Sequence, residues 1–249
     1  MTGFARILLC GEGPHDMGSD YADEEGWLQP LIRKLADGDA QLLFERLPRT
    51  RLAPVAGAKR PSPHLGGHGH GAYNAMREAK VRGCDIVVYM VDNDGRKDRD
   101  RDRWRVICEQ IRDGFAAAGN PVCGVGCIPV SASEAWLLAD EAAWRQLGLR
   151  DPSGLPGNRA ETIWGQRDDP DGDHPHRYFA RICRSAGGED GVSIRHRVGE
   201  LLSMETLARN CPTSFAPFSR AMRHCLARCR CVAAHDFTSV LDDANWCRP

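Results

Sequence analysis

One run constrains the fold more than any other part of the sequence: residues 86–91, IVVYMV, are all apolar and mostly β-branched. Such a strand fits the centre of a parallel sheet, where helices bury both faces. Apolar runs at 5–9, 41–45 and 122–130 predict three further strands. We therefore expect an α/β fold built on a parallel sheet.

Helices are predicted between and after these strands. Apolar side chains recur at helical spacing in residues 27–35, 72–81 and 104–118, and Ser133 is expected to cap a short helix. Residues 48–71 are rich in Pro, Gly, Arg and His without periodicity, which predicts a long loop. Strands that alternate with helices favour a parallel sheet flanked by helices.

The character of the chain changes after Gly148. Asp, Gly and Pro dominate the next stretch, and the remainder has helical patterns at 178–185, 196–210 and 215–232. We therefore predict an α/β domain over residues 1–148 and a mostly helical C-terminal extension, residues 149–249, packed on it.

Composition excludes some classes of function. The 249 residues carry 33 basic and 34 acidic side chains, so the chain lacks the strongly basic balance of a histone-like nucleic-acid binder. None of its apolar runs approaches the roughly 18 residues of a membrane span. The first apolar run ends in Gly-Glu-Gly instead of a small-residue cleavage site. We expect a cytoplasmic protein without a membrane partner.

The chain has 11 cysteines, an odd number that argues against a complete disulfide framework. We interpret most of them as reduced and buried. The densest group is Cys225, Cys229 and Cys231, whose spacing differs from that of the usual structural zinc sites. Zinc binding there stays open.

Acidic residues follow three of the predicted strands, and these are Glu12, Asp16, Asp92, Asp94, Glu134 and Asp140. Ligands bind at the carboxyl ends of strands in an open α/β sheet, so we expect these acids to converge. Converging carboxylates repel unless a cation neutralises them, and an oxygen-rich site suits Mg²⁺ or Mn²⁺. The sequence thus predicts a metal site of the kind that handles phosphates. The alternative is that residues 92–95, DNDG, form a simple turn.

Three blocks, ILLCGEGPHD, IVVYMVDNDG and IPVSASEAWLLAD, stand in this order and spacing. Together they resemble the TOPRIM (topoisomerase-primase) domain. The chain is most similar to a bacterial TOPRIM-like family of uncharacterised proteins related to overcoming-lysogenisation-defect nucleases. The segments LPGNRAETIW, HPHRYFARI and ARNCPTSFAPFSRAM resemble C-terminal segments of that family, so the likeness covers most of the chain.

The resemblance implies a four-stranded parallel sheet with an Mg²⁺ site at its carboxyl edge. Glu12 matches the family's glutamate, Asp92 and Asp94 match its aspartate pair, and Glu134 matches a further acid; these four would be catalytic. Asp16 stands where relatives more often have glutamate. Residues 174–176, His-Pro-His, stand where a Pro-Lys pair is expected, which leaves the basic group there in doubt. Relatives often act beside an ATPase in bacterial defence against phage, which implies a partner ATPase.

Basic residues near these motifs predict a nucleic-acid surface. Arg96 and Lys97 directly follow the aspartate pair, and Arg177 and Arg181 share a helical face. We expect DNA rather than RNA as the partner. The alternatives are a solvated helix start at 96–105 and structural pairing of the later arginines with the aspartates at 168–173.

Histidines at 64, 68 and 70 lie among glycines in HLGGHGHG. They could contact a metal or a phosphate, because glycines let the backbone approach a ligand. An incidental histidine-rich loop is the alternative.

The leading hypothesis is an Mg²⁺-dependent nuclease in which Asp16 and Asp140 complete or orient the metal shell. One alternative is a non-catalytic module of a larger complex, and another is phosphoryl transfer on a small nucleotide. Walker A, dinucleotide-binding and Gly-x-Ser-x-Gly motifs are absent from the sequence, which removes support for ATP hydrolysis and serine chemistry. A homo-oligomer stays open.

Overall fold

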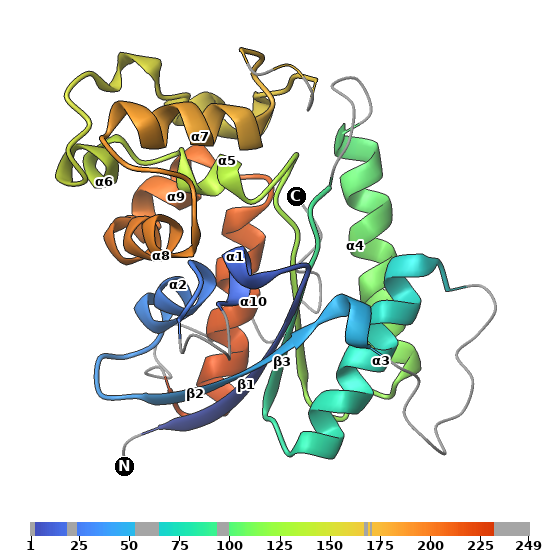
Figure 1. The fold of residues 1–249 in the computed structure, drawn as a ribbon. Helices are drawn as coiled ribbons and strands as arrows, with labels where there is room; N and C mark the ends of the chain where they lie inside the picture. The colour runs from blue at the N-terminus through green and yellow to red at the C-terminus, as the bar shows by residue number, and fades with distance from the viewer. Residues whose placement is uncertain are drawn as a thin grey trace.

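A four-stranded, all-parallel sheet in the order β2-β1-β3-β4 forms the centre of the fold (Figure 1). The strands are β1 (Phe4–Gly11), β2 (Gln41–Pro48), β3 (Ile86–Met90) and β4 (Cys123–Cys127). The computed structural model describes residues 3–18, 24–52, 65–93, 100–166, 169 and 171–231, with the side chains of 100 and 101 left out. The predicted α/β class with a parallel sheet flanked by helices is confirmed.

The two faces of the sheet bury alternate residues of each strand, as the period of a β-strand requires. Ile7 and Val88 point into one hydrophobic cluster, whereas Leu8 and Val87 point into the other. Strand β3 is buried along its whole length because it lies between β1 and β4 and both its faces are covered.

Helices α3 (Gly67–Arg82) and α4 (Asp100–Ala117) cover one face of the sheet, and α2 (Leu28–Leu35) and α10 (Phe215–Arg228) cover the other (Figure 1). Their apolar stripes explain this placement, because a surface helix buries one face against a core. Helix α10 comes from the C-terminal part of the chain and contacts β4, so this part completes the core of the sheet.

The remaining helical elements lie over the carboxyl edge of the sheet or beside α2 (Figure 1). They are α1 (Pro14–Met17), α5 (Glu134–Leu137), α6 (Glu141–Gln146), α7 (Pro175–Ser185), α8 (Val192–Leu201), α9 (Met204–Asn210) and the 3-10 turns η1 (Arg49–Arg51), η2 (Pro152–Gly154) and η3 (Gly157–Thr162). Trp136 of α5 packs edge-on against Trp27 and Phe215, at 5.8 and 5.1 Å between ring centroids. These contacts join the edge helices to the main core.

The predicted loop at 48–71 is wrong at its end, because α3 begins at Gly67. Tertiary packing overrides the low helix propensity of glycine here. A Cβ atom on Gly114 of α4 would lie 2.2 Å from the carbonyl oxygen of Gly69, so glycines at both positions let α3 and α4 approach closely. These glycines serve helix packing.

Two other local predictions need correction. The helix predicted at 196–210 is interrupted at Leu202, whose backbone is extended, and Ser203 caps the new helix α9 by accepting a hydrogen bond from the Thr206 amide (3.3 Å). Ser133 makes no side-chain cap on α5; its backbone amide instead donates to Asp92 (2.9 Å).

Cysteines in the described ranges are free, and most of them are buried. Among the helices that the structure describes, each is too short or too polar to cross a bilayer.

Candidate functional site

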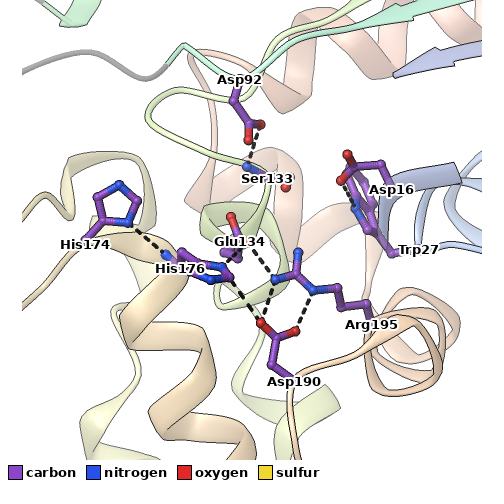
Figure 2. A network of polar contacts seen from close by, with 9 residues as sticks. All are labelled: Asp16, Trp27, Asp92, Ser133, Glu134, His174, His176, Asp190 and Arg195. Carbon is purple, nitrogen blue, oxygen red and sulfur yellow. Dashed lines mark hydrogen bonds and ion pairs between the residues drawn. The ribbon is translucent and has the colours of Figure 1, made fainter. Parts of the chain in front are cut away.

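The carboxyl edge of the sheet gathers the ends of β1, β3 and β4 under the helices α5, α7 and α8 (Figures 1 and 2). Helix α1, after β1, carries Asp16; Asp92 lies two residues beyond β3; Glu134 is the first residue of α5. Figure 2 shows these three side chains around one region. These three acids therefore lie at the same edge of the sheet.

Asp92 links two of the strand ends. Its Oδ1 accepts a hydrogen bond from the Ser133 amide at 2.9 Å, which ties the loop before α5 to the end of β3. The charges of Asp92 and Asp16 both act on the buried Cys127 thiol, whose pKa is raised well above its usual value mainly by burial. Both carboxylates thus lie within electrostatic reach of the last residue of β4.

Asp16 is a buried carboxyl with one polar partner in the described structure. Its Oδ1 accepts a hydrogen bond from Nε1 of Trp27 at 3.0 Å. Burial raises the pKa of Asp16 to about 6; the charges of Glu134 and Glu12 also raise it, and Trp27 and Arg195 oppose the shift. The ionised form of Asp16 is therefore disfavoured mainly because the carboxyl is buried away from water.

Glu134 is held by a buried ion-pair network (Figure 2). Nη2 of Arg195 donates to its Oε1 at 2.7 Å, and Nδ1 of His176 lies 3.2 Å from the same oxygen. Arg195 is 2 % exposed and also donates two hydrogen bonds to Asp190, at 2.7 and 2.9 Å. Burial alone would raise the pKa of Glu134, but His176 and Arg195 hold it at about 2. Glu134 is therefore ionised at any physiological pH.

The ionised Glu134 determines the state of the His176 ring. A carboxylate can only accept a hydrogen bond, so Nδ1 of His176 carries the hydrogen in this contact. The side chain of His176 is 39 % exposed, and its other nitrogen is left as an acceptor or a second donor. His174 caps α7 by accepting the His176 amide at 3.3 Å. The His-Pro-His segment thus presents an oriented imidazole at this edge.

A third histidine belongs to the same region. His15 precedes Asp16 on α1, and its pKa is lowered by burial and then by the positive charge of Arg195, against the opposing charges of Asp190 and Glu134. His15 is therefore a neutral imidazole near neutral pH, close to the ion-pair network.

Glu12 and Asp140 have other partners. Glu12 is exposed and pairs with Arg49 at 2.9 Å. Asp140 caps α6 by accepting the Ala142 amide at 3.0 Å, and its second oxygen accepts the Ser203 amide at 2.7 Å. Both oxygens of Asp140 hold helix ends in place, so we do not include it in the metal site proposed below.

The predicted nucleic-acid contacts are placed only in part, because Asp94, Arg96, Lys97 and the histidine at 64 lie outside the described residues. Arg181 donates to the Gly172 carbonyl at 2.6 Å, pairs with Asp173 at 3.3 Å and lies over the Tyr178 ring. That is the structural pairing weighed as the alternative. Arg177 lies half-buried on the same helix, α7.

Sequence reasoning missed Arg195 and Asp190. One local feature could have indicated Arg195: it stands three residues before the buried Val198, on the apolar stripe of α8. A charged residue on such a stripe needs a buried partner. The identity of that partner is not a local property of the sequence.

Donor chemistry favours a cation next to Asp16 and Asp92. A hard divalent ion prefers carboxylate oxygens, and it would stabilise the ionised form of Asp16, whose pKa is raised mainly by burial. Within the part of the chain that the structure describes, His, Cys, Asp and Glu form no metal-binding group of three or more. Asp94, the other acid of the predicted aspartate pair, lies outside that part.

No family model matches the sequence, and neither the curated proteins nor the solved structures give a significant match.

Proposed function

We propose that this protein is a metal-dependent nuclease of the TOPRIM-like class that cleaves phosphodiester bonds in DNA with Mg²⁺ or Mn²⁺. One observation supports the proposal: Asp16 and Asp92, which follow two adjacent strands, both lie within electrostatic reach of Cys127, at the sheet edge that also holds a buried arginine network (Figure 2). Separated acids at the carboxyl edge of a parallel sheet are a recurrent basis for handling phosphates.

The residues that would hold the ion are Asp16, Asp92 and Asp94, with Glu12 at the rim. When bound, such an ion activates water and stabilises a leaving oxygen. Asp92 is anchored through the Ser133 amide, which donates to its Oδ1 at 2.9 Å and fixes the carboxylate at the end of β3. The ionised fraction of Asp16, which is the form that binds a cation, increases as pH rises above its pKa of about 6.

The ion-pair network contributes positive charge and orientation. Arg195 fixes Glu134 and Asp190, and Glu134 in turn orients His176. The partly exposed imidazole can then donate to a phosphate oxygen, or exchange a hydrogen bond with a water molecule at the site. In this proposal Glu134 positions His176 and is not a metal ligand.

A second function, a non-catalytic interaction module of a defence complex with a partner ATPase, is favoured by a different observation. Two of the four predicted catalytic acids already have cationic partners, since Glu12 pairs with Arg49 and Glu134 with Arg195. A site kept for its charge network alone would bind metal weakly.

The test is cleavage of plasmid DNA, single-stranded DNA and RNA with Mg²⁺ or Mn²⁺, comparing wild type with Asp92→Asn. Asparagine can still accept the Ser133 amide, so the variant should keep its fold. We expect at least about a 100-fold loss of rate. Asp113→Asn, at an exposed aspartate of α4, is the matched control and should cleave like wild type.

Equal rates in wild type and Asp92→Asn would identify a contaminating nuclease and contradict the proposal. If the purified protein cleaves none of these substrates and Mg²⁺ binding is weak, the non-catalytic module is favoured instead. Cleavage confined to mononucleotides would favour phosphoryl transfer on a small nucleotide.

A further inference from the structure

A second charged cluster lies on the α3 and α4 side of the same sheet edge. Arg49 belongs to the turn η1 after β2, His68 to the first turn of α3, and Arg103 to α4. Figure 1 shows the end of β2 beside the first turns of α3. Three segments that are distant in sequence thus carry basic residues on this side of the sheet edge.

Arg49 is held in position but retains an unused donor. Its Nη2 pairs with Glu12 at 2.9 Å, and its guanidinium lies 5.9 Å from the centre of the Tyr89 ring. The Nη1 atom of Arg49 is buried and has no hydrogen-bond partner among the described residues. A buried donor without an acceptor destabilises a fold unless something occupies it.

His68 lies within the field of both arginines. Its pKa is lowered first by burial and then by the positive charges of Arg49 and Arg103. Its backbone amide contacts the side chain of Gln110 on α4, at 3.4 Å, so the first turn of α3 is fixed against α4. The cluster is therefore built on rigid elements.

Arginine stays charged at every physiological pH, so the two guanidinium groups attract an anion. Glu12 pairs with Nη2 of Arg49 from an exposed position, whereas the buried Nη1 has no hydrogen-bond partner among the described residues. A guanidinium with a free N–H beside an imidazole matches the acceptor oxygens of a phosphate group.

We propose that Arg49, His68 and Arg103 form a phosphate-binding site beside Glu12, separate from the Glu134–Arg195 network. The expected source of the phosphate is a polynucleotide backbone, and this identification rests on the proposed nuclease function. In that arrangement the cluster holds a phosphate away from the one that is cleaved and aligns the strand along the sheet edge.

The test measures equilibrium binding of a fluorescent DNA duplex in EDTA, over a series of NaCl concentrations, by anisotropy. Arg49→Gln should weaken binding about tenfold. The negative slope of log K against log salt should also become less steep by about 0.9, because one phosphate contact is lost. Arg145→Gln, at an exposed arginine of α6 paired with Glu141, is the matched control and should leave both quantities almost unchanged.

Two further variants keep the test independent of folding. Arg103 is exposed, so Arg103→Gln should retain the fold and give a weaker effect of the same sign. Arg49→Lys keeps the charge but loses the planar fork, so it should restore the salt slope more than the affinity.

A second arm measures inorganic phosphate by calorimetry. Competition between phosphate and DNA in wild type, absent in Arg49→Gln, supports the site and identifies the backbone as the source. Phosphate binding that depends on Arg49 while DNA affinity does not supports a site for free phosphate groups. Equal binding of both ligands by wild type and Arg49→Gln, or no binding of either by wild type, overturns the proposal.

Because the binding test is run in EDTA, its result does not depend on metal-dependent cleavage. Arg49-dependent DNA binding without any metal-dependent cleavage would retain the phosphate site and remove the nuclease. Cleavage that depends on Asp92 together with Arg49-independent binding would do the reverse.

Discussion

Arg195 donates to Glu134 at 2.7 Å from a position 61 residues further along the chain, and both side chains are almost completely buried. The pair joins α8 to α5, the helix that follows the loop anchored by Asp92. A buried ion pair adds little net stability by itself, but removal of one partner leaves the other charge uncompensated. The network therefore holds α5 and α8 in a fixed arrangement, and a variant that removes one partner should be less stable.

We expect Glu134→Gln to lower the free energy of unfolding by about 3 kcal/mol. Arg195 then keeps Asp190 but loses its second acidic partner, Glu134. Glu141→Gln removes an exposed ion pair with Arg145 and should change stability by less than about 1 kcal/mol. Urea denaturation at neutral pH measures both. Equal small effects would mean that Arg195 finds another acceptor.

The contribution of Glu134 to stability depends on pH at the acid end. Its pKa is about 2 in the folded protein against 4.5 for an unperturbed group. Between these values the unfolded chain binds more protons, so stability rises with pH. The contribution is fully present above pH 4.5 and is lost as pH falls towards 2. The stability difference between wild type and Glu134→Gln should narrow over that range.

Asp16 changes stability with pH in the opposite direction. Its pKa rises from 3.8 to about 6 on folding, so between these values the folded state binds more protons and stability falls as pH rises. Asp16→Asn removes the buried charge and can still accept from Trp27. In EDTA, we expect the variant to be more stable than wild type by about 3 kcal/mol above pH 6, and equal to it below pH 3.8. A variant less stable than wild type at every pH would contradict this assignment.

The sheet could be predicted from sequence because its information is local. The run 86–91 is apolar at every position, and both the position and the burial of β3 follow from that. The acids at the strand ends could be predicted as well, since parallel strands end at one edge, and the structure brings Asp16, Asp92 and Glu134 there.

The partners of those acids could not be predicted in the same way. Asp140 and Glu134 look alike in sequence, yet one caps a helix and the other binds a buried arginine. Which donor reaches each carboxylate depends on how α8 and α9 pack, and that packing is decided by contacts between residues far apart in the chain. The start of α3 was missed for a related reason, because its glycines fit a loop until α4 packs against them.

The close packing of α3 on α4 predicts a strong asymmetry between two glycines. A Cβ on Gly114 would lie 2.2 Å from a backbone oxygen, so Gly114→Ala should destabilise the protein by about 1–3 kcal/mol. Gly67 has open space around it, and Gly67→Ala in the first turn of α3 should be neutral or stabilising by up to about 1 kcal/mol. Urea midpoints of the two variants test this, and a tolerated Gly114→Ala would mean that the helices can separate.

Mg²⁺ should stabilise the folded protein through Asp92 and not through Asp140. An ion that binds the folded state at about 100 times its Kd adds about 2.7 kcal/mol, or a rise in Tm of about 5–10 °C for a chain of this size. Asp92→Asn should lose most of that rise while keeping its Ser133 hydrogen bond. Asp140→Asn should unfold at lower temperature in EDTA, because its amide nitrogen cannot accept from Ser203, yet keep the full response to Mg²⁺. Thermal unfolding with and without Mg²⁺ therefore distinguishes the metal site from the helix cap: a response lost in Asp140→Asn and retained in Asp92→Asn would exchange the two roles.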